Sequence, residues 1–286
     1  MGLDLAVVVV NHNAGPFLRR CMESLGTSAG DARIEVAVVD NDSSDGSPEE
    51  ALEERPDLLL IRNGTNRGFA AAANQGIAAT TAPFVLLLNP DAEVVGGTLG
   101  ALVKVARERP RAGAIGALVR NPNGSLQPSA RRVPRLGEAL GHAFLGPIAP
   151  NNRFTRSYTM AGWDRATERE VEWVSGSAML LRREALDQVG VLDEGYFMYV
   201  EDVDICTRLR NGGWQVLFSP ELEVVHQIGV STQGQRGRMA FAHSRSIYRY
   251  FSKYRAGGVR VLLKPFVATA LWLRALMMSA LPRRRD

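Results

Sequence analysis

The chain has 286 residues, of which 45% are hydrophobic and 22% are charged. This composition suits one large folded domain, or one domain with an appendage, and argues against a disordered protein. The net charge of +4 is unevenly distributed, because residues 249–286 contain nine Lys or Arg side chains and one acid. That segment therefore carries +8 and the rest of the chain −4. Such a basic segment indicates an anionic partner, either a membrane surface or a nucleic acid.

Two further features indicate a cytosolic protein. Cys21 and Cys206 lie far apart in the chain and match no metal-binding spacing. We therefore expect two reduced thiols in the core. No basic region precedes the first apolar run, and residues 7–10 are too short for the hydrophobic part of a signal peptide. A secreted protein is therefore not expected.

Strands and helices alternate in the first hundred residues. Continuous aliphatic runs predict buried strands at residues 4–11, 34–39, 58–61 and 84–89. Helices are predicted after Pro16, after an N-cap at Ser47, and over residues 68–79. This order predicts an α/β fold with a mostly parallel sheet and helices on both faces.

The alternation weakens after a helix at residues 98–107. Asn123-Gly124 predicts a hairpin turn, and residues 128–165 are expected to form loops with one short helix over Leu136–Leu145. Regular structure is expected again from the apolar run at residues 171–181. It is followed by a helix over residues 183–189, a helix that opens at Glu201 and closes near Gly212, and a strand over residues 215–218.

Residues 259–281 are apolar but are interrupted by three cationic side chains and by Pro265. A membrane-spanning helix needs about 20 mostly apolar residues, and the longest uncharged run, residues 265–273, is far shorter. We expect instead a basic amphipathic helix at the membrane interface, with Trp272 at headgroup depth and residues 283–285 on anionic lipid. The alternative is a helix packed on the domain with a frayed basic end. Nucleic acid is disfavoured, because the basic residues lie among Leu, Val and Met rather than among base-stacking aromatics in a polar groove.

Polar side chains follow all four predicted strands of the first half. Ligands of parallel sheets bind at the carboxyl ends of the strands, so these groups are expected at one edge. Each has a plainer interpretation as a turn or cap residue, but four together favour a ligand site. The candidate donor-binding residues are Asn11, Asn13, Asp40, Asp42, Arg67 and Asn89.

The ligand class follows from what this edge contains. No phosphate-binding Gly-x-x-x-x-Gly-Lys-Ser/Thr loop or Gly-x-Gly-x-x-Gly loop is present. Acids beside a diphosphate would repel it unless a divalent cation lies between them. Asp91, with Asn89 two residues before it, is a candidate metal or ribose contact. Asp40 and Asp42 could accept hydrogen bonds from a base and a ribose, and Arg67 could contact the phosphates.

Two later features are candidates for the chemistry. Glu201, Asp202 and Asp204 fall in the first turn of a predicted helix, where acids commonly cap and complement the helix dipole. Three acids exceed that need, and the aromatic segment before them would desolvate a carboxylate and suit it to be a general base. His226 follows a strand-like segment. A lone His is more often structural, but this one could return to the same sheet edge and bind a divalent metal.

Six ordered segments resemble family-two inverting glycosyltransferases of the GT-A fold. They are VVVVNHN, VVDNDSSDGS, GTNRGFAAAANQG, LLLNPDAEV, WVSGSAMLLRR and GYFMYVEDVDICTRLRNGGW, followed by VVHQIGVST, and they cover about residues 5–232. NPNGSLQPSARRVP and FMYVEDVD resemble the bacterial rhamnosyltransferases that move L-rhamnose from dTDP-rhamnose to an N-acetylglucosaminyl diphospho-polyprenol.

The resemblance implies roles for individual residues. Asp40 would contact the base, Asp42 the nucleoside, and Asp91 would hold Mg²⁺ or Mn²⁺. Asn89 stands where many relatives have the first acid of an Asp-x-Asp motif, so His226 would have to complete the metal shell. In the second half, Asp202 would be the catalytic base and Glu201 would bind the acceptor. Trp173, Ser175 and Gly176 would line the acceptor pocket.

The resulting hypothesis has a GT-A domain at residues 1–240, with a nucleotide-binding half (1–95) and an acceptor-binding half (96–240). Residues 241–286 would form a helical, membrane-associating extension, which places the enzyme on the inner face of the cell membrane. A homodimer stays open. Two alternatives remain: a nucleotidyltransferase that makes a nucleotide sugar, and a catalytically weak nucleotide-sugar-binding module.

Overall fold

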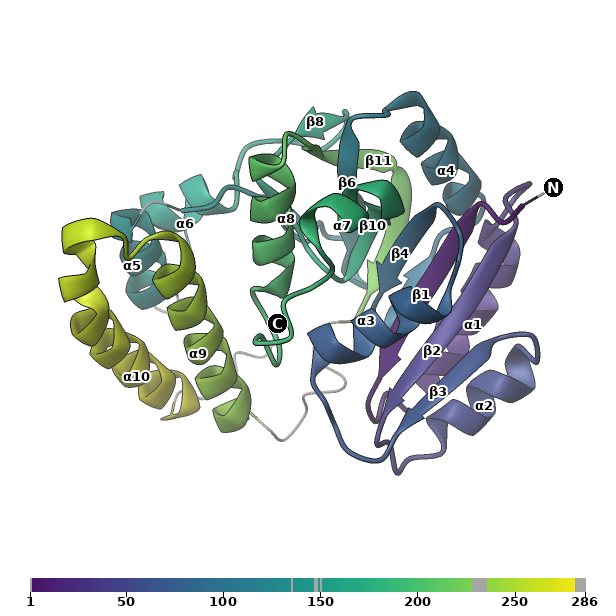
Figure 1. The fold of residues 1–286 in the computed structure, drawn as a ribbon, viewed down its shortest axis with the longest axis horizontal. Coiled ribbons are helices and arrows are strands. Elements are labelled where there is room, and N and C mark those ends of the chain that lie inside the picture. The colour runs from purple at the N-terminus through teal and green to yellow at the C-terminus, as the bar shows by residue number, and fades with distance from the viewer. Residues whose placement is uncertain (1, 135, 147–148, 150, 228–235, 281–286) are drawn as a thin grey trace.

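A computed structural model describes residues 2–134, 136–146, 149, 151–227 and 236–280 of the chain (Figure 1). The strands are β1 Leu5–Asn11, β2 Ile34–Asn41, β3 Leu59–Asn63, β4 Phe84–Leu88, β5 Ala92–Val94, β6 Ala112–Arg120, β7 Ala130–Arg131, β8 Arg169–Glu170, β9 Trp173–Val174, β10 Ala178–Arg182 and β11 Gln215–His226. The helices are α1 Pro16–Ser28, α2 Ser47–Glu54, α3 Phe69–Ala79, α4 Thr98–Glu108, α5 Leu136–Leu145, α6 Arg153–Tyr158, α7 Arg183–Val189, α8 Glu201–Asn211, α9 Arg236–Tyr254, the 3₁₀ helix η1 Gly258–Leu263 and α10 Lys264–Ala280.

The central sheet has the order β3-β2-β1-β4-β10-β6-β11-β5, with β8 added beside β11. Strands β1 to β4 pair in parallel, as do β6 and β11, whereas β10 is antiparallel to both of its neighbours. The predicted mostly parallel α/β sheet is confirmed. Its parallel half brings the carboxyl ends of four strands to one edge.

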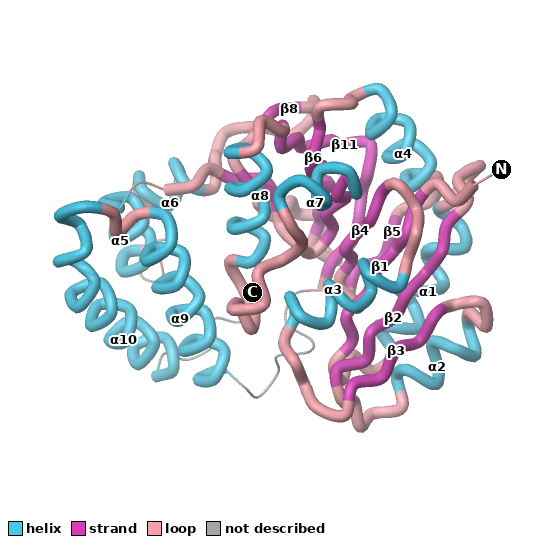
Figure 2. Tube along the Cα trace, viewed as in Figure 1, coloured by secondary structure: helices cyan, strands magenta, loops and turns pink. Residues whose placement is uncertain are grey.

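Helices cover both faces of the sheet, as predicted (Figure 2). The odd-numbered residues of β1 from Leu5 to Val9 face a core shared with α1 and α4. The even-numbered residues from Ala6 to Val10 face a second core shared with α3, α7 and α8. A strand buried on both faces must be apolar throughout, which explains the continuous run of aliphatic residues. Cys21 and Cys206 are free and buried in these cores, also as predicted.

Several elements differ from those predicted. The strand β6 and the helix α6 were not expected, and β11 runs to His226 rather than to Phe218. The N-cap of α2 is Gly46 in a left-handed conformation, and Ser47 is already helical. Ser47 instead donates a hydrogen bond from its hydroxyl to Asp45 Oδ1 at 2.6 Å.

The C-terminal helices α9 and α10 pack against each other beside the main domain (Figure 1). The buried carboxylate of Asp204 on α8 fixes α9 in place. It accepts hydrogen bonds from Lys253 Nζ and the Tyr254 hydroxyl, both at 2.8 Å, and from Arg208 Nε at 2.8 Å. One of the three acids at the start of α8 is therefore structural. The expected domain boundary at residue 240 falls inside α9 and stays a prediction.

The segment Gly258–Ser279, which combines η1 and most of α10, is long and apolar enough to cross a membrane by length and composition. Only 17% of its most apolar window is buried. The inner side of α10 packs through Leu271 and Ala275, while Phe266 and Trp272 are 74% and 55% exposed. The helix thus packs on the protein with one side and presents an apolar surface with the other.

Candidate active site

The ends of β1, β2 and β3 meet in a network of polar side chains. Asn11 is fully buried and donates its amide to Asp40 Oδ1 at 3.1 Å, which orients that carboxylate. Asp40 also accepts a hydrogen bond from the backbone N–H of Ser43 at 3.3 Å. Farther along the edge, Asn63 donates to Asn41 Oδ1 at 2.9 Å. The predicted gathering of polar groups at this edge is observed.

The loops after β1 and β2 are bound to each other. Asn13 and Asp42 both have positive φ angles, of 51° and 69°, a conformation that Asn and Asp tolerate better than most residues. Asn13 Oδ1 accepts the backbone N–H of Ser44 at 2.8 Å, so its side chain supports the second loop. The Asp42 side chain is exposed. Asp42 is therefore free to contact a ligand, whereas Asn13 already has a structural partner.

Arg67 and the start of α3 adjoin the second half of the molecule. The backbone N–H of Phe69 donates to the carbonyl of Phe197 at 2.7 Å. Gly68 has a φ of +85°, and a Cβ at this position would overlap that same carbonyl oxygen. Only glycine therefore permits this contact. It places the exposed Arg67 side chain next to the segment that leads into Glu201 and Asp202.

Asp91 and His226 lie side by side, although 135 residues separate them. Strand β11 pairs with β5, which places His226 opposite Ala92. His226 Nε2 is 3.1 Å from Asp91 Oδ1 and 3.1 Å from Asn89 Nδ2. Asn89 and Asp91 thus both lie next to the Nε2 atom of His226, so the predicted metal and donor contacts are brought together.

Gln127 sets the tautomer of His226. Its amide nitrogen donates to the carbonyl of His226 at 2.8 Å and to Asn121 Oδ1 at 2.9 Å. Its amide oxygen therefore faces His226 Nδ1, at 3.1 Å, and accepts a hydrogen from it. Nδ1 then carries a proton, and the lone pair of Nε2 points toward Asp91. An imidazole oriented in this way by an outer hydrogen bond is typical of metal-binding histidines.

The donor atoms fit a divalent metal that shares its shell with a diphosphate. In the described part of the chain, no three His, Cys, Asp or Glu side chains cluster closely enough to enclose an ion. Asp91 and His226 alone would leave most positions to other ligands. Mg²⁺ in nucleotide sites is held in that way, by one or two carboxylates and by substrate phosphates. A carboxylate 3.1 Å from an imidazole lone pair also favours a cation between them.

Asp202 is held by two backbone donors at the start of α8. Gly176 N–H donates to Oδ2 at 3.1 Å and Val203 N–H to Oδ1 at 2.8 Å. The side chain is only partly buried, so one side of the carboxylate remains open. The residue before the pair, Val200, has a φ of 70°, which is strained for a β-branched residue. Such strain commonly occurs where a side chain must be aimed at a functional site.

The two neighbouring carboxyls differ in their ability to ionise. Burial and the adjacent Asp202 raise the pKa of Glu201 well above its usual range, and its Oε2 atom is buried without a hydrogen-bond partner. Burial also raises the pKa of Asp202, but hydrogen bonds from Gly176 and Val203 and the positive charge of Arg131 oppose the increase. A proton shared by the pair is therefore held on Glu201, which leaves Asp202 as the carboxylate able to accept a proton.

A short chain of contacts joins the metal candidates to Asp202. The backbone N–H of Asn89 donates to the carbonyl of Ser177 at 2.9 Å, because β10 runs antiparallel to β4. Ser177 donates from its hydroxyl to Ser175 at 3.1 Å, and Gly176 between them binds Asp202. The sequence 175–177 interrupts what looked like one apolar run. Residues 175–177 thus connect the end of β4 to Asp202.

Trp173 does not line an open pocket. It is 95% buried, since only 5% of its surface is exposed, and its indole N–H donates to the carbonyl of Arg132 at 3.1 Å. The Arg131 guanidinium lies 5.0 Å from its ring centroid and donates to the Tyr158 hydroxyl at 3.1 Å. Trp173 therefore supports Arg131, whose positive charge acts on Asp202. Its expected contact with the acceptor is at most indirect.

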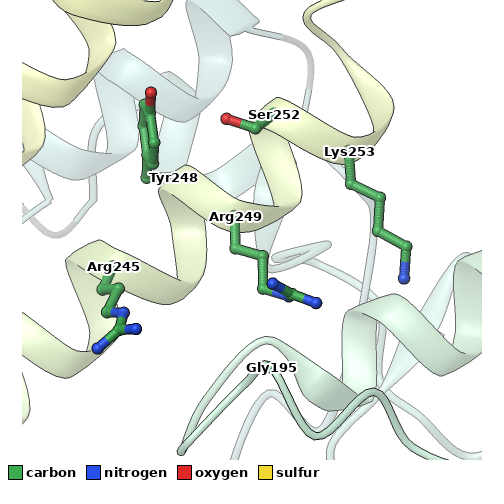
Figure 3. Close-up of a pocket in the computed structure, with 6 residues that line it drawn as sticks. All are labelled: Gly195, Arg245, Tyr248, Arg249, Ser252 and Lys253. Carbon is green, nitrogen blue, oxygen red and sulfur yellow. The ribbon is translucent and has the colours of Figure 1, made fainter.

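A cavity of about 460 Å³ lies between α9 and the loop before α8 (Figure 3). Arg249 and Lys253 extend from α9 toward this loop and bind Asp193 at 2.7 and 2.8 Å. Burial alone would raise the pKa of Asp193, but these hydrogen bonds outweigh it and hold the pKa below its usual range. The cations are thus used to attach α9, and none of the acids assigned to the chemistry lines this cavity.

Sequence reasoning missed Gln127 and Arg131. Both lie within NPNGSLQPSARRVP, the segment that suggested one branch of the family, but it offers no periodicity from which to place them. In the structure, Gln127 N–H donates to Val119 of β6, and Arg131 pairs with Trp173 across β7 and β9. The position of Gln127 depends on its contact with β6, and the position of Arg131 depends on the pairing of β7 with β9. Neither contact could be predicted from the sequence.

The chain was compared with known protein families and with curated proteins. Residues 6–190 match "Glycosyl transferase family 2" and residues 149–283 match "Glycosyl transferase family group 2". N-acetylglucosaminyl-diphospho-decaprenol L-rhamnosyltransferase of Mycobacterium tuberculosis is 38% identical over 99% of this chain and 95% of that protein. Rhamnosyltransferase WbbL of Escherichia coli is 25% identical over 87% of this chain and 93% of its own.

Solved structures show the same fold. A mannosyltransferase from Pyrobaculum calidifontis, in complex with GDP-Man and Mn²⁺, has a TM-score of 0.61 at 18% identity and covers 99% of this chain and 77% of that one. GalNAc-T7 with UDP, GalNAc and Mn²⁺ has a TM-score of 0.62 at 18% identity and covers 94% and 54%. The fold is therefore GT-A, and the family matches and the mycobacterial relative show that this chain belongs to glycosyltransferase family 2.

Proposed function

We propose that the enzyme transfers L-rhamnose from dTDP-rhamnose to an N-acetylglucosaminyl diphospho-polyprenol, a step in the synthesis of cell-wall or surface polysaccharide. The observation that carries the proposal is the connection between the two halves of the site, from Asp91 through Asn89 and Ser177 to Asp202. The names of the mycobacterial and E. coli relatives supply the sugar and the acceptor. A nucleotidyltransferase is disfavoured because family and fold both indicate glycosyl transfer.

The donor would lie along the carboxyl edge of β1 to β4. Asp40, held in place by Asn11, accepts hydrogen bonds from the base, and the exposed Asp42 contacts the nucleoside. Arg67 is exposed at the same edge and attracts the diphosphate. Asp91 and His226 would hold Mg²⁺ or Mn²⁺, and Asn89 lies close enough to orient either the metal or the ribose. Bound there, the metal would stabilise negative charge on the departing diphosphate.

The acceptor sugar would lie over Ser175 and Gly176. Asp202 removes the proton from the acceptor hydroxyl, whose oxygen attacks the anomeric carbon. The bond from that carbon to the donor diphosphate breaks, and its electron pair leaves with dTDP. One base and no enzyme-bound intermediate give inversion at the anomeric carbon. Glu201 holds its proton and can donate a hydrogen bond to the acceptor.

A transfer assay tests the function. Purified enzyme is mixed with dTDP-rhamnose, a short-chain N-acetylglucosaminyl diphospho-polyprenol and Mn²⁺ or Mg²⁺, and the lipid product and free dTDP are quantified. We expect one rhamnose transferred for each dTDP released, and no transfer from UDP-glucose or GDP-mannose. Pyrophosphate as a product would instead indicate a nucleotidyltransferase, and donor binding without turnover a binding module.

We also propose that the enzyme is a peripheral protein of the inner membrane face, with η1 and α10 at the interface. Support comes from the outward apolar residues, since Val259, Leu262, Phe266 and Leu273 recur at helical spacing on the exposed side. Arg260 and Lys264 at the start of this segment would meet anionic headgroups. The homodimer stays a prediction.

Membrane binding can be tested without disturbing the fold. Deleting residues 259–286 should move the protein from membrane to soluble fractions, but it also uncovers α9. Replacing Phe266 and Trp272 by Glu is the cleaner change, because both side chains are exposed. Each aromatic side chain that is buried in the membrane contributes about 1.5–3 kcal/mol to partitioning. We therefore expect the affinity for phosphatidylglycerol vesicles, measured by co-sedimentation, to fall at least tenfold. Leu59→Glu, at an exposed apolar residue of β3, is the control. Equal sedimentation of all variants would reject the interfacial helix.

A further inference from the structure

Four basic side chains from four separate elements act on one another electrostatically, and the first of them also acts on Asp202. They are Arg131 of β7, His142 of α5, His243 of α9 and Arg274 of α10. Tyr158 links two of them, because its ring is 4.5 Å from the ring of His142 and its hydroxyl accepts a hydrogen bond from Arg131 at 3.1 Å. His243 lies 5.1 Å from the ring of Tyr199, two residues before Glu201. We call these four residues the basic cluster.

Arg274 is on the inner side of α10. It lies between Leu271 and Ala275, which are both buried, whereas Leu273 and Leu276 are exposed. Its Nε atom is buried, and no described residue hydrogen-bonds to it. Arg274 as a whole is half-buried, but a guanidinium nitrogen enclosed without a hydrogen-bond partner is costly unless an anion compensates the charge.

The electrostatic surroundings of the cluster are cationic. Burial, then Arg131 and Arg274, lower the pKa of His142 to about 4. Burial, then Arg274, Arg131 and His142, lower the pKa of His243 to about 3. Both pKa values are thus lowered by burial and by neighbouring cations. The cluster has donors and positive charge in excess, an arrangement that attracts an anion.

The groups between Asp202 and the outer side of α10 can be compared with the groups of the proposed acceptor, and both series have the same order. Asp202 comes first, then Arg131 whose charge acts on it, then the rest of the basic cluster, and finally the apolar outer side of α10. The acceptor likewise has a sugar hydroxyl, then a diphosphate, then a hydrocarbon chain. Figure 1 shows α9 and α10 on the α8 side of the molecule, at the far end from β3.

We propose that the basic cluster binds the diphosphate of the lipid-linked acceptor, with Arg274 as its principal ligand. This inference rests on the proposed function for the identity of the acceptor, but the affinity for a diphosphate is a property of the cluster alone. Arg131 would bind the phosphate nearest the sugar, while Arg274 would bind at the point where the lipid chain begins. Two adjacent phosphates suit bidentate guanidinium groups better than they suit lysine.

Calorimetric titration with pyrophosphate tests the cluster directly. EDTA is included so that the metal-dependent donor site does not contribute. We expect saturable binding by the full-length protein and at least tenfold weaker binding by Arg274→Gln, since the change removes charged hydrogen bonds to the phosphates. Arg274→Lys should recover part of the affinity. Arg245→Gln, at an exposed arginine of α9, should bind like the wild type. No binding by the wild type, or no loss in Arg274→Gln, would overturn the proposal.

Kinetics with two acceptors separate this role from packing and from lipid binding. With N-acetylglucosaminyl diphospho-polyprenol, Arg274→Gln should raise the acceptor KM at least tenfold and leave the dTDP-rhamnose KM unchanged. With an uncharged alkyl N-acetylglucosaminide, wild type and variant should have equal KM values. Equal losses with both acceptors would indicate a packing role, and weaker binding to phosphatidylglycerol vesicles with unchanged acceptor KM would indicate a headgroup site; either result rejects the proposal. If wild-type enzyme transfers to neither acceptor, the proposed function fails, while the pyrophosphate titration still decides on the cluster.

Discussion

Replacing Asp202 by Asn is expected to lower kcat for rhamnosyl transfer by about 10²–10⁴-fold, the usual contribution of a general base. Asn keeps the volume of the side chain and can still accept a hydrogen bond from Gly176, so the local structure should persist. The proposed donor site is the edge of β1 to β4, so donor binding should be nearly unchanged. Kinetics with saturating acceptor and a titration with dTDP-rhamnose measure the two quantities separately.

Two carboxyl-to-amide changes serve as controls for this prediction. Glu201→Gln should retain activity to within about tenfold, because the raised pKa of Glu201 keeps it protonated and Gln resembles the neutral acid. Asp187→Asn, at an exposed position of α7, should have no effect. A large loss in Glu201→Gln together with near-normal rates in Asp202→Asn would exchange the two roles.

The pH dependence provides a further check on Asp202. The base is active when ionised, so transfer must decline as pH falls through its pKa in the folded enzyme. Burial raises that pKa. The acidic limb of kcat/KM should therefore lie above about 3.9, the value of an unperturbed aspartate. The limb should disappear from the residual activity of Asp202→Asn, and its persistence there would assign it to another group.

Much of the donor edge could be predicted from sequence because its geometry is almost local. Each strand of the first half is followed at once by its polar residues, and parallel pairing brings those ends together. Asn11 opposite Asp40 in the β1–β2 register is a direct consequence. The position of Asp202 in the first turn of α8 could also be predicted, because the acids directly follow an aromatic segment and precede a helical pattern.

The strand β6, which was not predicted, shows why local sequence patterns can fail to identify a strand. Its sequence AGAIGALVR is rich in Ala and Gly, which are uncommon in strands. The structure explains the glycines, because a Cβ on Gly116 would overlap Val174 and one on Gly113 would overlap Trp214. These neighbours are distant in the chain. The small residues are therefore required by packing that a local pattern does not contain.

The strand β11 was predicted too short for a related reason. Pro220 led to the prediction that the strand ends near it, because proline cannot donate a backbone hydrogen bond and normally ends a strand. Here the pairing of β11 with β6 shifts register between Ser219 and Glu223, which accommodates the proline, and the strand continues to His226. This irregularity carries His226 to Asp91. The feature that obscured the strand is therefore the one that completes the candidate metal site.

Replacing Asp91 by Asn is expected to lower metal-dependent transfer on the order of 10³-fold, a loss typical when a group that stabilises transition-state charge is removed. Asp91 is the one carboxylate that contacts His226 among the described residues, and Asn89 cannot supply the missing charge. The Mn²⁺ concentration for half-maximal rate should rise steeply. His226→Ala should also lose activity, and Gln127→Leu should weaken metal binding by about 10–100-fold, because it only orients the imidazole.

The responses of these variants to Mn²⁺ distinguish a metal site from a purely structural ion pair between Asp91 and His226. Glu93→Gln is the matched control, because Glu93 is half-exposed on β5, two residues after Asp91, and its carboxylate lies 3.8 Å from Arg20. It should titrate with Mn²⁺ like the wild type. If Asp91 and His226 formed only a structural pair, their variants would lose thermal stability while keeping the wild-type Mn²⁺ dependence. If they hold the metal, Mn²⁺ should stabilise the wild type against heat in the presence of dTDP and leave Asp91→Asn unaffected, by mass action on the folded state.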